Sequence, residues 1–194
     1  MKKKTGAFIF SILIMGLLIM LADGCKKDDT NNISTPLIIG QHSLGGIVAY
    51  IFQPGDPGYD VNVQHGLIAA PGDQSTGMVW YNGNFITTGA VETGLRAGNE
   101  NTALIIACQG EGNYAAKICS DLVLNGYSDW ALPSEEELIK LNLNKTAIGG
   151  FNANYYWSST ECSAGTAWVY NFGSSVFGNI SKCTSCCVRA VRTF

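Results

Sequence analysis

Charge is scarce in this chain, and the shortage limits the partners it can have. Charged residues make up 14% of the sequence, and 12 Lys and Arg stand against 15 Asp and Glu, for a net charge of -3. Binding to nucleic acid relies on basic patches that neutralise phosphates. The composition therefore predicts no nucleic-acid partner, and it disfavours a polyanionic ligand unless a local basic patch forms.

Histidine is also nearly absent, since His42 and His65 are the two in the sequence. The segment around Ser43 resembles the nucleophile elbow of lipases, in which a strained turn after a strand exposes a serine. Here Gln41 replaces the leading glycine, a β-like segment follows, and His65 is the single histidine further on. The pattern predicts no hydrolase, and we expect no catalytic residues and no enzyme activity.

The sequence has one long apolar run, and it lies at the N-terminus. Three lysines precede the run Ala7–Ala22, which ends at Asp23-Gly24-Cys25. This layout is typical of a secretory signal, predicted here over residues 1–24. A retained membrane anchor is the alternative, although a spanning helix needs about 20 apolar residues.

Cys25 is expected to attach the exported chain to the membrane. Residues 21–25 resemble a lipobox, in which the cysteine is lipidated and becomes the new N-terminus, although Asp23 stands where that motif has a small residue. Residues 25–36 are polar and predict a flexible tether. The expected product is a lipoprotein of the outer membrane or cell surface. A periplasm-facing orientation stays open.

The remaining residues, 37–194, have the pattern of one α+β domain. Short β-type runs separated by Gly, Asn and Pro predict strands over residues 46–52, 65–70, 78–81, 156–159, 167–172 and 188–191. A helix is predicted from about Tyr114 to Leu124. A second begins at Ser134, because Ser134-Glu135-Glu136-Glu137 is a capping box.

Six cysteines follow Cys25, and in an exported chain the default expectation is disulfide pairing. Cys183 and Cys186 form a C-x-x-C, but no second pair or nearby histidine completes a tetrahedral zinc site. No metal and no cofactor are therefore predicted. The pairing of Cys162, Cys183, Cys186 and Cys187 stays open.

An ordered string of motifs resembles a known family. It comprises Gly45–Val48, His65–Leu67, Ala69–Ser75, Asn101-Thr102, Leu122–Trp130, Leu132–Ser134, Tyr155–Ser159 and Val188–Arg192. These resemble the domain named after the C-terminal part of a bacterial collagen-like adhesin, the Lcl C-terminal domain family, over roughly residues 37–194. The resemblance implies a C-type-lectin-like fold, similar to formylglycine-generating enzymes, with two helices, a small twisted antiparallel sheet and long loops. It also implies a disulfide between Cys108 and Cys119.

The segment Ser174–Cys187 is unusual for a core strand because it is small, polar and rich in cysteine. Some relatives resemble the variable proteins of diversity-generating retroelements, which randomise the adenines of AAY codons. Such codons cannot give Lys, Gln, Glu, Met or Trp, and Lys182 is the one residue of this segment outside the reachable set. Diversification on a rigid scaffold is one hypothesis. A fixed loop with two disulfides is the other.

We expect this late segment to form a binding face, because loops on a rigid scaffold tolerate change. Arg189 and Arg192 are expected to anchor the last strand. The expected partner is a host or bacterial surface glycan or protein, bound by an adhesin-like domain or variable receptor. A formylglycine-generating-type thiol enzyme and a structural envelope protein are the alternatives. The expected contact residues are Thr166, Val169, Tyr170, Ser174, Ser175, Phe177, Ile180, Ser181, Thr184 and Ser185.

Overall fold

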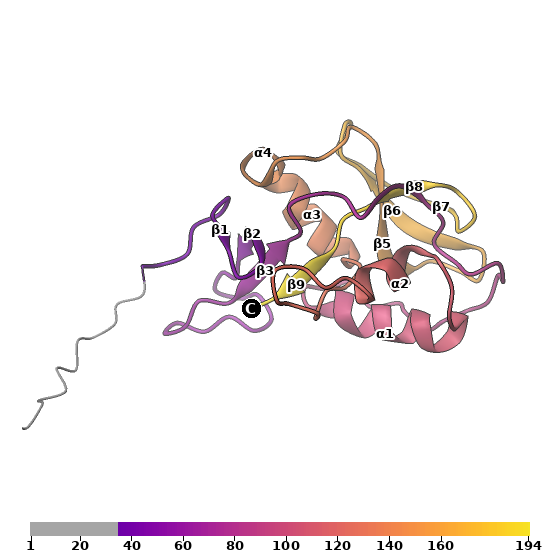
Figure 1. The fold of residues 1–194 in the computed structure, drawn as a ribbon, viewed down its shortest axis with the longest axis horizontal. Helices are drawn as coiled ribbons and strands as arrows, with labels where there is room; N and C mark the ends of the chain where they lie inside the picture. Colours follow the sequence, from indigo (N-terminus) through magenta and orange to yellow (C-terminus); the bar gives the residue numbers. More distant parts are fainter. Residues whose placement is uncertain (1–34) are drawn as a thin grey trace, which may run out of the picture. The chain divides into compact units, whose positions relative to one another are not determined.

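The computed structural model describes residues 35–194, which form one unit (Figure 1). The predicted signal peptide, Cys25 and most of the predicted tether lie outside the described residues. The described unit contains both helices and sheets, so the α+β prediction is confirmed.

The first sheet joins the two ends of the described unit. Its order is β1 (His42–Ser43), β2 (Gly46–Ile51), β3 (Gly66–Ala69) and β9 (Val191–Thr193), all antiparallel. The predicted strands at 46–52 and 65–70 are confirmed to within a residue at each end. The first and last strands of the described unit therefore belong to the same sheet.

Ser43 lies in a hairpin and has none of the geometry of a nucleophile elbow. Ser43 pairs with Gly46, and the two residues between them, Leu44 and Gly45, have φ angles of 50° and 88°. Positive φ at both central residues is the requirement of the type I′ turn that joins tight hairpins. Gly45 is needed there, since a Cβ on it would lie 2.3 Å from the ring of Tyr127.

The second sheet holds the late segment. Its order is β4 (Ser75–Met78), β8 (Cys186–Val188), β5 (Tyr155–Glu161), β6 (Thr166–Asn171) and β7 (Val176–Ser181). The β5–β8 pair is parallel and the other pairs are antiparallel, so the sheet is mixed where an antiparallel one was expected. The strand expected at 78–81 lies earlier, at β4.

The predicted strand at 188–191 is two strands in different sheets. β8 ends at Val188 and β9 begins at Val191, so Arg189 and Ala190 carry the chain from one sheet to the other. The Ala190 carbonyl still accepts a hydrogen bond from the Ala70 amide, 2.9 Å away. One short segment of the chain therefore supplies strands to both sheets.

Four helices are described where two were expected. α1 (Ala97–Gln109) was not predicted, α2 (Ala115–Ser120) is shorter than expected, and α3 (Glu135–Leu143) and α4 (Lys145–Ile148) follow. The capping box of α3 is confirmed: the Ser134 hydroxyl accepts from the Glu137 amide, and the Glu137 carboxylate accepts from the Ser134 amide.

α1 has the spacing of a buried helix but not its usual residues. Its buried positions, three or four residues apart, are Gly98, Asn101, Thr102, Ile105 and Gln109. Four of these five are not hydrophobic, so no apolar stripe marks the helix in the sequence. α1 packs against β5, and α3 packs against β5, β6 and β2.

Tryptophans fill the core between these layers. Trp130 and Trp157 are buried, while Trp168 is half-buried. Trp80 is completely buried, and its indole Nε1 donates to the Ser158 carbonyl at 2.8 Å. The adjoining turn Asn82-Gly83-Asn84 lies nearer the surface.

The cysteines correct a further prediction. The six described cysteines are free, so the Cys108–Cys119 disulfide is not formed in the structure, nor are bonds among Cys162, Cys183, Cys186 and Cys187. Cys108 is exposed and its sulfur faces the Thr88 carbonyl, whereas Cys119 is buried in the core. The two thiols therefore occupy different environments on neighbouring helices.

Candidate binding face

The late face consists of the β6–β7 hairpin and the loops that flank β7. The hairpin is in register along its length, from Thr166 opposite Ser181 to Asn171 opposite Val176. Opposed residues share a face of the sheet, and alternate pairs therefore lie on opposite faces. β7 is the edge strand of the sheet, so β6 is its one strand neighbour in the described residues.

Eight of the ten predicted contact residues are at least partly exposed. The loop residues are fully exposed, and the strand residues are half-buried. The eight are Thr166, Ser174, Ser175, Phe177, Ile180, Ser181, Thr184 and Ser185. The structure places them on the β6–β7 hairpin and the two loops that adjoin β7.

The other two predicted contact residues are buried, which corrects their assignment. Val169 has no exposed surface, because it lies opposite Trp157 in the core. Tyr170 is 7% exposed; its ring packs against Phe172 and Phe177, and its hydroxyl accepts from the Asn142 amide nitrogen at 3.0 Å. Val169 therefore supports the hairpin from the core side, whereas Tyr170 lies on the opposite side of the sheet, beside Phe177.

Two aromatic residues lie on the outer part of the face. Trp168 and Phe177 are half-buried, with ring centroids 6.5 Å apart in an edge-on arrangement. Asn179, opposite Trp168, is exposed. The combination of an aromatic ring and neighbouring amide and hydroxyl groups is suited to polar ligands with apolar surfaces, such as sugars.

A buried ion pair holds the end of β7. Lys182 has no exposed surface; its ammonium bonds the Glu161 carboxylate, donates to the Ile86 carbonyl at 3.0 Å, and lies 4.3 Å from the centre of the Trp80 ring. Glu161 also accepts from the Thr88 and Gly89 amides. This pair therefore joins β7, β5 and the loop that contains residues 81–89.

Two further ion pairs hold the last part of the chain. Arg189, fully buried, bonds Asp73 at 2.7 Å and the Gly150 carbonyl at 2.5 Å. Arg192 bonds Asp129 at 2.7 Å, and this guanidinium lowers the pKa of the Asp129 carboxyl. The two arginines anchor the last strands, as expected. We call the three pairs Lys182–Glu161, Arg189–Asp73 and Arg192–Asp129 the ionic frame.

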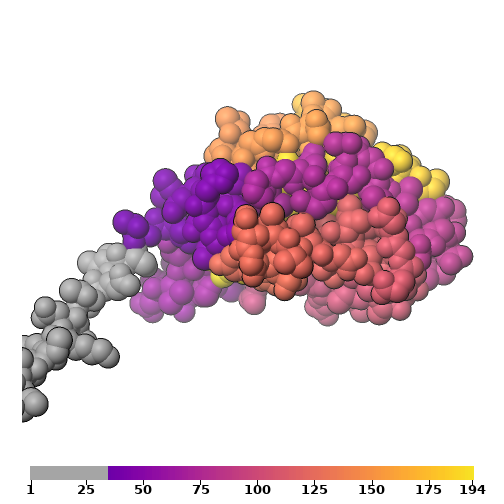
Figure 2. All heavy atoms as spheres, in the orientation of Figure 1, coloured from indigo at the N-terminus to yellow at the C-terminus, as the bar shows by residue number. Residues whose placement is uncertain are grey.

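The loop beside the late face was not identified from the sequence as a contact region. Phe85 and Ile86 are exposed, and the ring of Phe85 stacks on that of Tyr81 with centroids 4.7 Å apart. Trp80 and Lys182 join this loop to the end of β7 through backbone hydrogen bonds, and the two segments lie side by side at one end of the molecule (Figure 2). The turn Asn82-Gly83-Asn84 was the signal that could have located it.

None of the helices between residues 35 and 194 has the length and apolar character that crossing a bilayer requires. In the same part of the chain, no cluster of three or more His, Cys, Asp or Glu side chains is placed to hold a metal ion.

Comparison with known proteins gives one family. The model of the Lcl C-terminal domain matches residues 71–192, which include α1 to α4 and all five strands of the second sheet. A search of curated proteins gives no match. The matched segment covers more than half of the chain and contains the whole late face, and on this basis the chain belongs to the Lcl C-terminal domain family.

Proposed function

We propose that this domain binds an external macromolecule through its late face, as an adhesin-like protein or variable receptor. The proposal rests on the contrast between the exposed contact residues and the ion pairs that hold the scaffold. The eight exposed contact residues bear no charge, while two pairs of the ionic frame, Lys182–Glu161 and Arg189–Asp73, are buried. Such a scaffold keeps its fold when surface residues change.

The chemistry of the face favours a glycan or a protein surface as the ligand. Ser and Thr hydroxyls adapt to donors and acceptors, and Trp168 and Phe177 offer aromatic surface, a combination that antibody loops also use. The face has no cationic side chain among its contact residues. Recognition would therefore depend on hydrogen bonds and stacking, and a sulfated polyanion would need a different surface.

The diversification hypothesis gains support from one position. Lys182 is the residue of segment 174–187 that randomised AAY codons cannot produce, and it is also the buried cation of the ionic frame. Cys186 and Cys187 lie inside the reachable set but are buried. A diversified face would therefore comprise the exposed positions and leave Lys182, Cys186 and Cys187 unchanged.

The proposed location is the outer membrane or cell surface, through lipid on Cys25. Expression with labelled palmitate would place label on the chain, and the variant Cys25→Ser would abolish the label and move the protein out of the membrane fraction. Palmitate label retained on the Cys25→Ser variant would contradict lipid attachment at Cys25.

The thiol-enzyme alternative is less well supported. Reactive cysteines need a depressed pKa. Burial raises the pKa of Cys186 to about 12 and also raises the pKa values of Cys187 and Cys119. These are the properties of packed thiols, which favours the binding role.

A glycan array that includes heparin fragments tests the binding role, with fluorescently labelled full chain as the probe. The triple variant Ser174→Asp, Thr184→Asp, Ser185→Asp should lose at least tenfold in signal on the glycans that the parent retains. The matched control places three aspartates at other exposed positions, Thr93, Ser120 and Ser128. Equal loss in both variants, or no retained glycan at all, would count against the proposal.

Sequencing the 3′ end of the gene across a grown population tests the diversification separately. We expect substitutions at the exposed positions of segment 162–187, with the codons for Trp168, Phe172, Lys182 and Val188–Arg192 constant. A uniform sequence would remove the variable-receptor form of the proposal and leave a face with one fixed ligand.

A further inference from the structure

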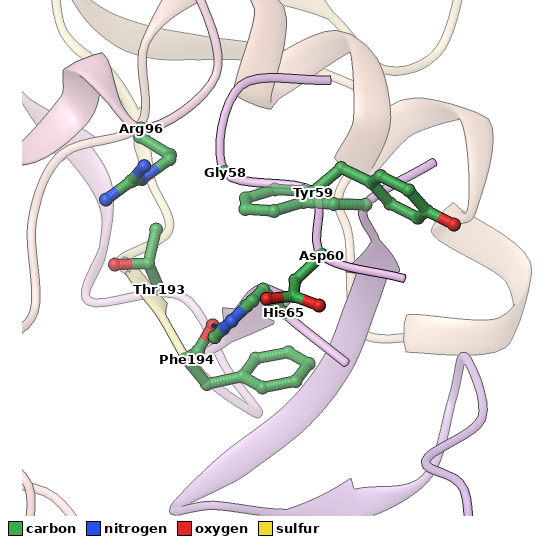
Figure 3. Close-up of a pocket in the computed structure, with 8 residues that line it drawn as sticks. Gly58, Tyr59, Asp60, His65, Arg96, Thr193 and Phe194 are labelled. Atoms are coloured by element: carbon green, nitrogen blue, oxygen red, sulfur yellow. Dashed lines mark hydrogen bonds between the residues drawn. The ribbon is translucent and has the colours of Figure 1, made fainter. Parts of the chain in front are cut away.

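A cavity lies beside the first sheet and the start of α1. Figure 1 shows that the first sheet and β7 are at opposite ends of the domain. The volume of the cavity is about 410 Å³, within the range of small-molecule sites. Residues from three separate segments surround it (Figure 3). They are Phe52, Gly58, Tyr59, Asp60, His65, Arg96, Thr193 and Phe194.

Arg96 differs from the other two arginines of the described region. Arg189 and Arg192 each bond an aspartate, whereas the guanidinium of Arg96 has no hydrogen bond or ion pair with any residue between 35 and 194. It lies against the backbone of Gly58, where a Cβ would be 2.8 Å from Nη1. The absence of a side chain at Gly58 therefore makes room for this cation at the cavity wall.

The backbone of Arg96 is held in a conformation that non-glycine residues rarely adopt. Its φ is 73°, and it precedes the first residue of α1. Its amide donates to Glu137 Oε1 at 2.8 Å, and the amide of Leu95 donates to Glu136 Oε2 at 3.1 Å. Strained residues persist where the surroundings fix them, and they gather at ligand sites. Two carboxylates thus bind the backbone here and leave the guanidinium free.

The remaining walls supply one ring nitrogen, one hydroxyl, aromatic surface and the Asp60 carboxylate, whose Oδ1 accepts a hydrogen bond from the Asn62 amide at 2.7 Å. His65 Nδ1 lies 3.1 Å from the Phe194 carbonyl oxygen, which fixes the ring and leaves Nε2 without a partner in the described residues. Thr193 offers a hydroxyl beside Arg96 (Figure 3). Phe52, Tyr59 and Phe194 provide the apolar part of the wall.

We propose that this cavity binds a small organic carboxylate, with Arg96 as its main contact. A guanidinium matches a carboxylate through two parallel hydrogen bonds. The ligand's body would pack on the aromatic rings, and its polar groups would reach Thr193 and His65. Nothing in this site depends on the late face, so it is a second binding function whose success or failure is independent of the first.

Nuclear magnetic resonance on the ¹⁵N-labelled full chain tests the site with two carboxylates and their neutral counterparts. Benzoate is compared with benzamide, and D-glucuronate with its methyl ester. We expect at least one carboxylate to shift the amides of Gly58, His65 and Thr193, with affinity at least tenfold above that of its neutral counterpart. The carboxylate that binds distinguishes an aromatic acid from a sugar acid.

The variant Arg96→Gly separates binding from folding. Glycine accepts a positive φ without strain, so this variant should keep or raise the melting temperature while it loses at least tenfold in affinity. Arg96→Lys keeps the positive charge but loses the paired hydrogen-bond donors of the guanidinium. Its affinity for the carboxylate should therefore lie between those of the parent and of Arg96→Gly. Lys117→Gln removes one positive charge from an exposed ion pair outside the cavity lining and should bind as the parent does.

Three outcomes would overturn the site. They are the absence of amide shifts at millimolar benzoate and glucuronate, equal losses in Arg96→Gly and Lys117→Gln, and shifts confined to residues away from the cavity. The late-face variants of the glycan-array experiment should leave carboxylate binding unchanged.

Discussion

The late face and Lys182 of the ionic frame are adjacent in the chain, yet they differ in charge and in burial. Lys182 is fully buried and charged, while Ser181 on one side is half-buried and Cys183 on the other is exposed. A substitution in the frame leaves a charge in the core, whereas one on the face alters surface that water already contacts. Under the proposed function, a residue that supports the fold thus lies between two residues available for recognition.

The largest effect is expected from Lys182→Met. Removal of one partner from a buried ion pair typically costs about 3–5 kcal/mol, because the other charge stays buried without compensation. Glu161 would keep its bonds to the Thr88 and Gly89 amides but lose its cation. Urea denaturation of the parent and variant should therefore show a loss of this size in the free energy of unfolding.

A double variant distinguishes charge from packing at this pair. Glu161→Gln added to Lys182→Met removes the unpaired charge and retains an oxygen for the Thr88 amide, so part of the lost stability should return. A single Lys182→Met variant that loses less than about 1 kcal/mol would mean that water reaches the pair, and the contrast between face and frame would not hold.

Glu137 is a buried carboxyl that has no cationic partner among residues 35–194, and it should make stability depend on pH. Burial raises its pKa to about 7 from the ordinary 4.5, although the amides of Ser134, Arg96 and Gly98 act in the opposite direction. The folded state therefore binds the proton more tightly between these values. Its contribution is fully present below pH 4.5 and is lost as pH rises through 7, by about 3 kcal/mol.

Chemical denaturation at several pH values between 4 and 8 measures this effect. The variant Glu137→Gln cannot ionise, so its stability curve should lack the decline that the parent shows between pH 4.5 and 7. The two curves would run parallel if the Ser134, Arg96 and Gly98 amides kept Glu137 ionised throughout.

Much of the fold could be predicted from local patterns. The hairpin strands and the capping box at Ser134 follow from alternation and from hydrogen bonds between near neighbours, which a sequence displays directly. α1 could not be predicted this way, since Asn101, Thr102 and Gln109 occupy its buried face. Their partners lie in distant segments: Glu92, Leu132, and Asn82 with Asn84.

The candidate sites show the same limit. The composition of Ser174–Cys187 indicated the late face. The two-residue period of a strand could not by itself place Val169 on the buried side of β6, because that assignment also needs the pairing of β6 with its neighbours. The Arg96 cavity had no sequence signal, because segments 52–65, 96 and 193–194 meet only in the folded chain. Residues distant in sequence cannot be assigned to one cavity from periodicity.

A moderate effect is expected from Ser134→Ala at the start of α3. The hydroxyl accepts from the Glu137 amide at 3.3 Å and donates to the Gly94 carbonyl at 2.7 Å, and the residue is fully buried. Loss of an N-cap typically costs about 1 kcal/mol. Thermal denaturation should show this loss in Ser134→Ala and a smaller one in Ser134→Thr, which keeps the hydroxyl. Equal losses would mean that packing, and not the cap, determines the effect.

The smallest effects on stability are expected on the late face itself. Thr184 and Ser185 are exposed, and neither side chain has a hydrogen-bond partner in the described residues. Thr184→Ala and Ser185→Ala should each change the free energy of unfolding by less than about 0.5 kcal/mol. Because Thr184 and Ser185 contribute little to the core, the double variant should lose no more free energy of unfolding than the two single variants lose together. A loss above 1 kcal/mol in either single variant would show that this loop supports the fold, and the separation of recognition from stability would then fail at the position where it is expected to be clearest.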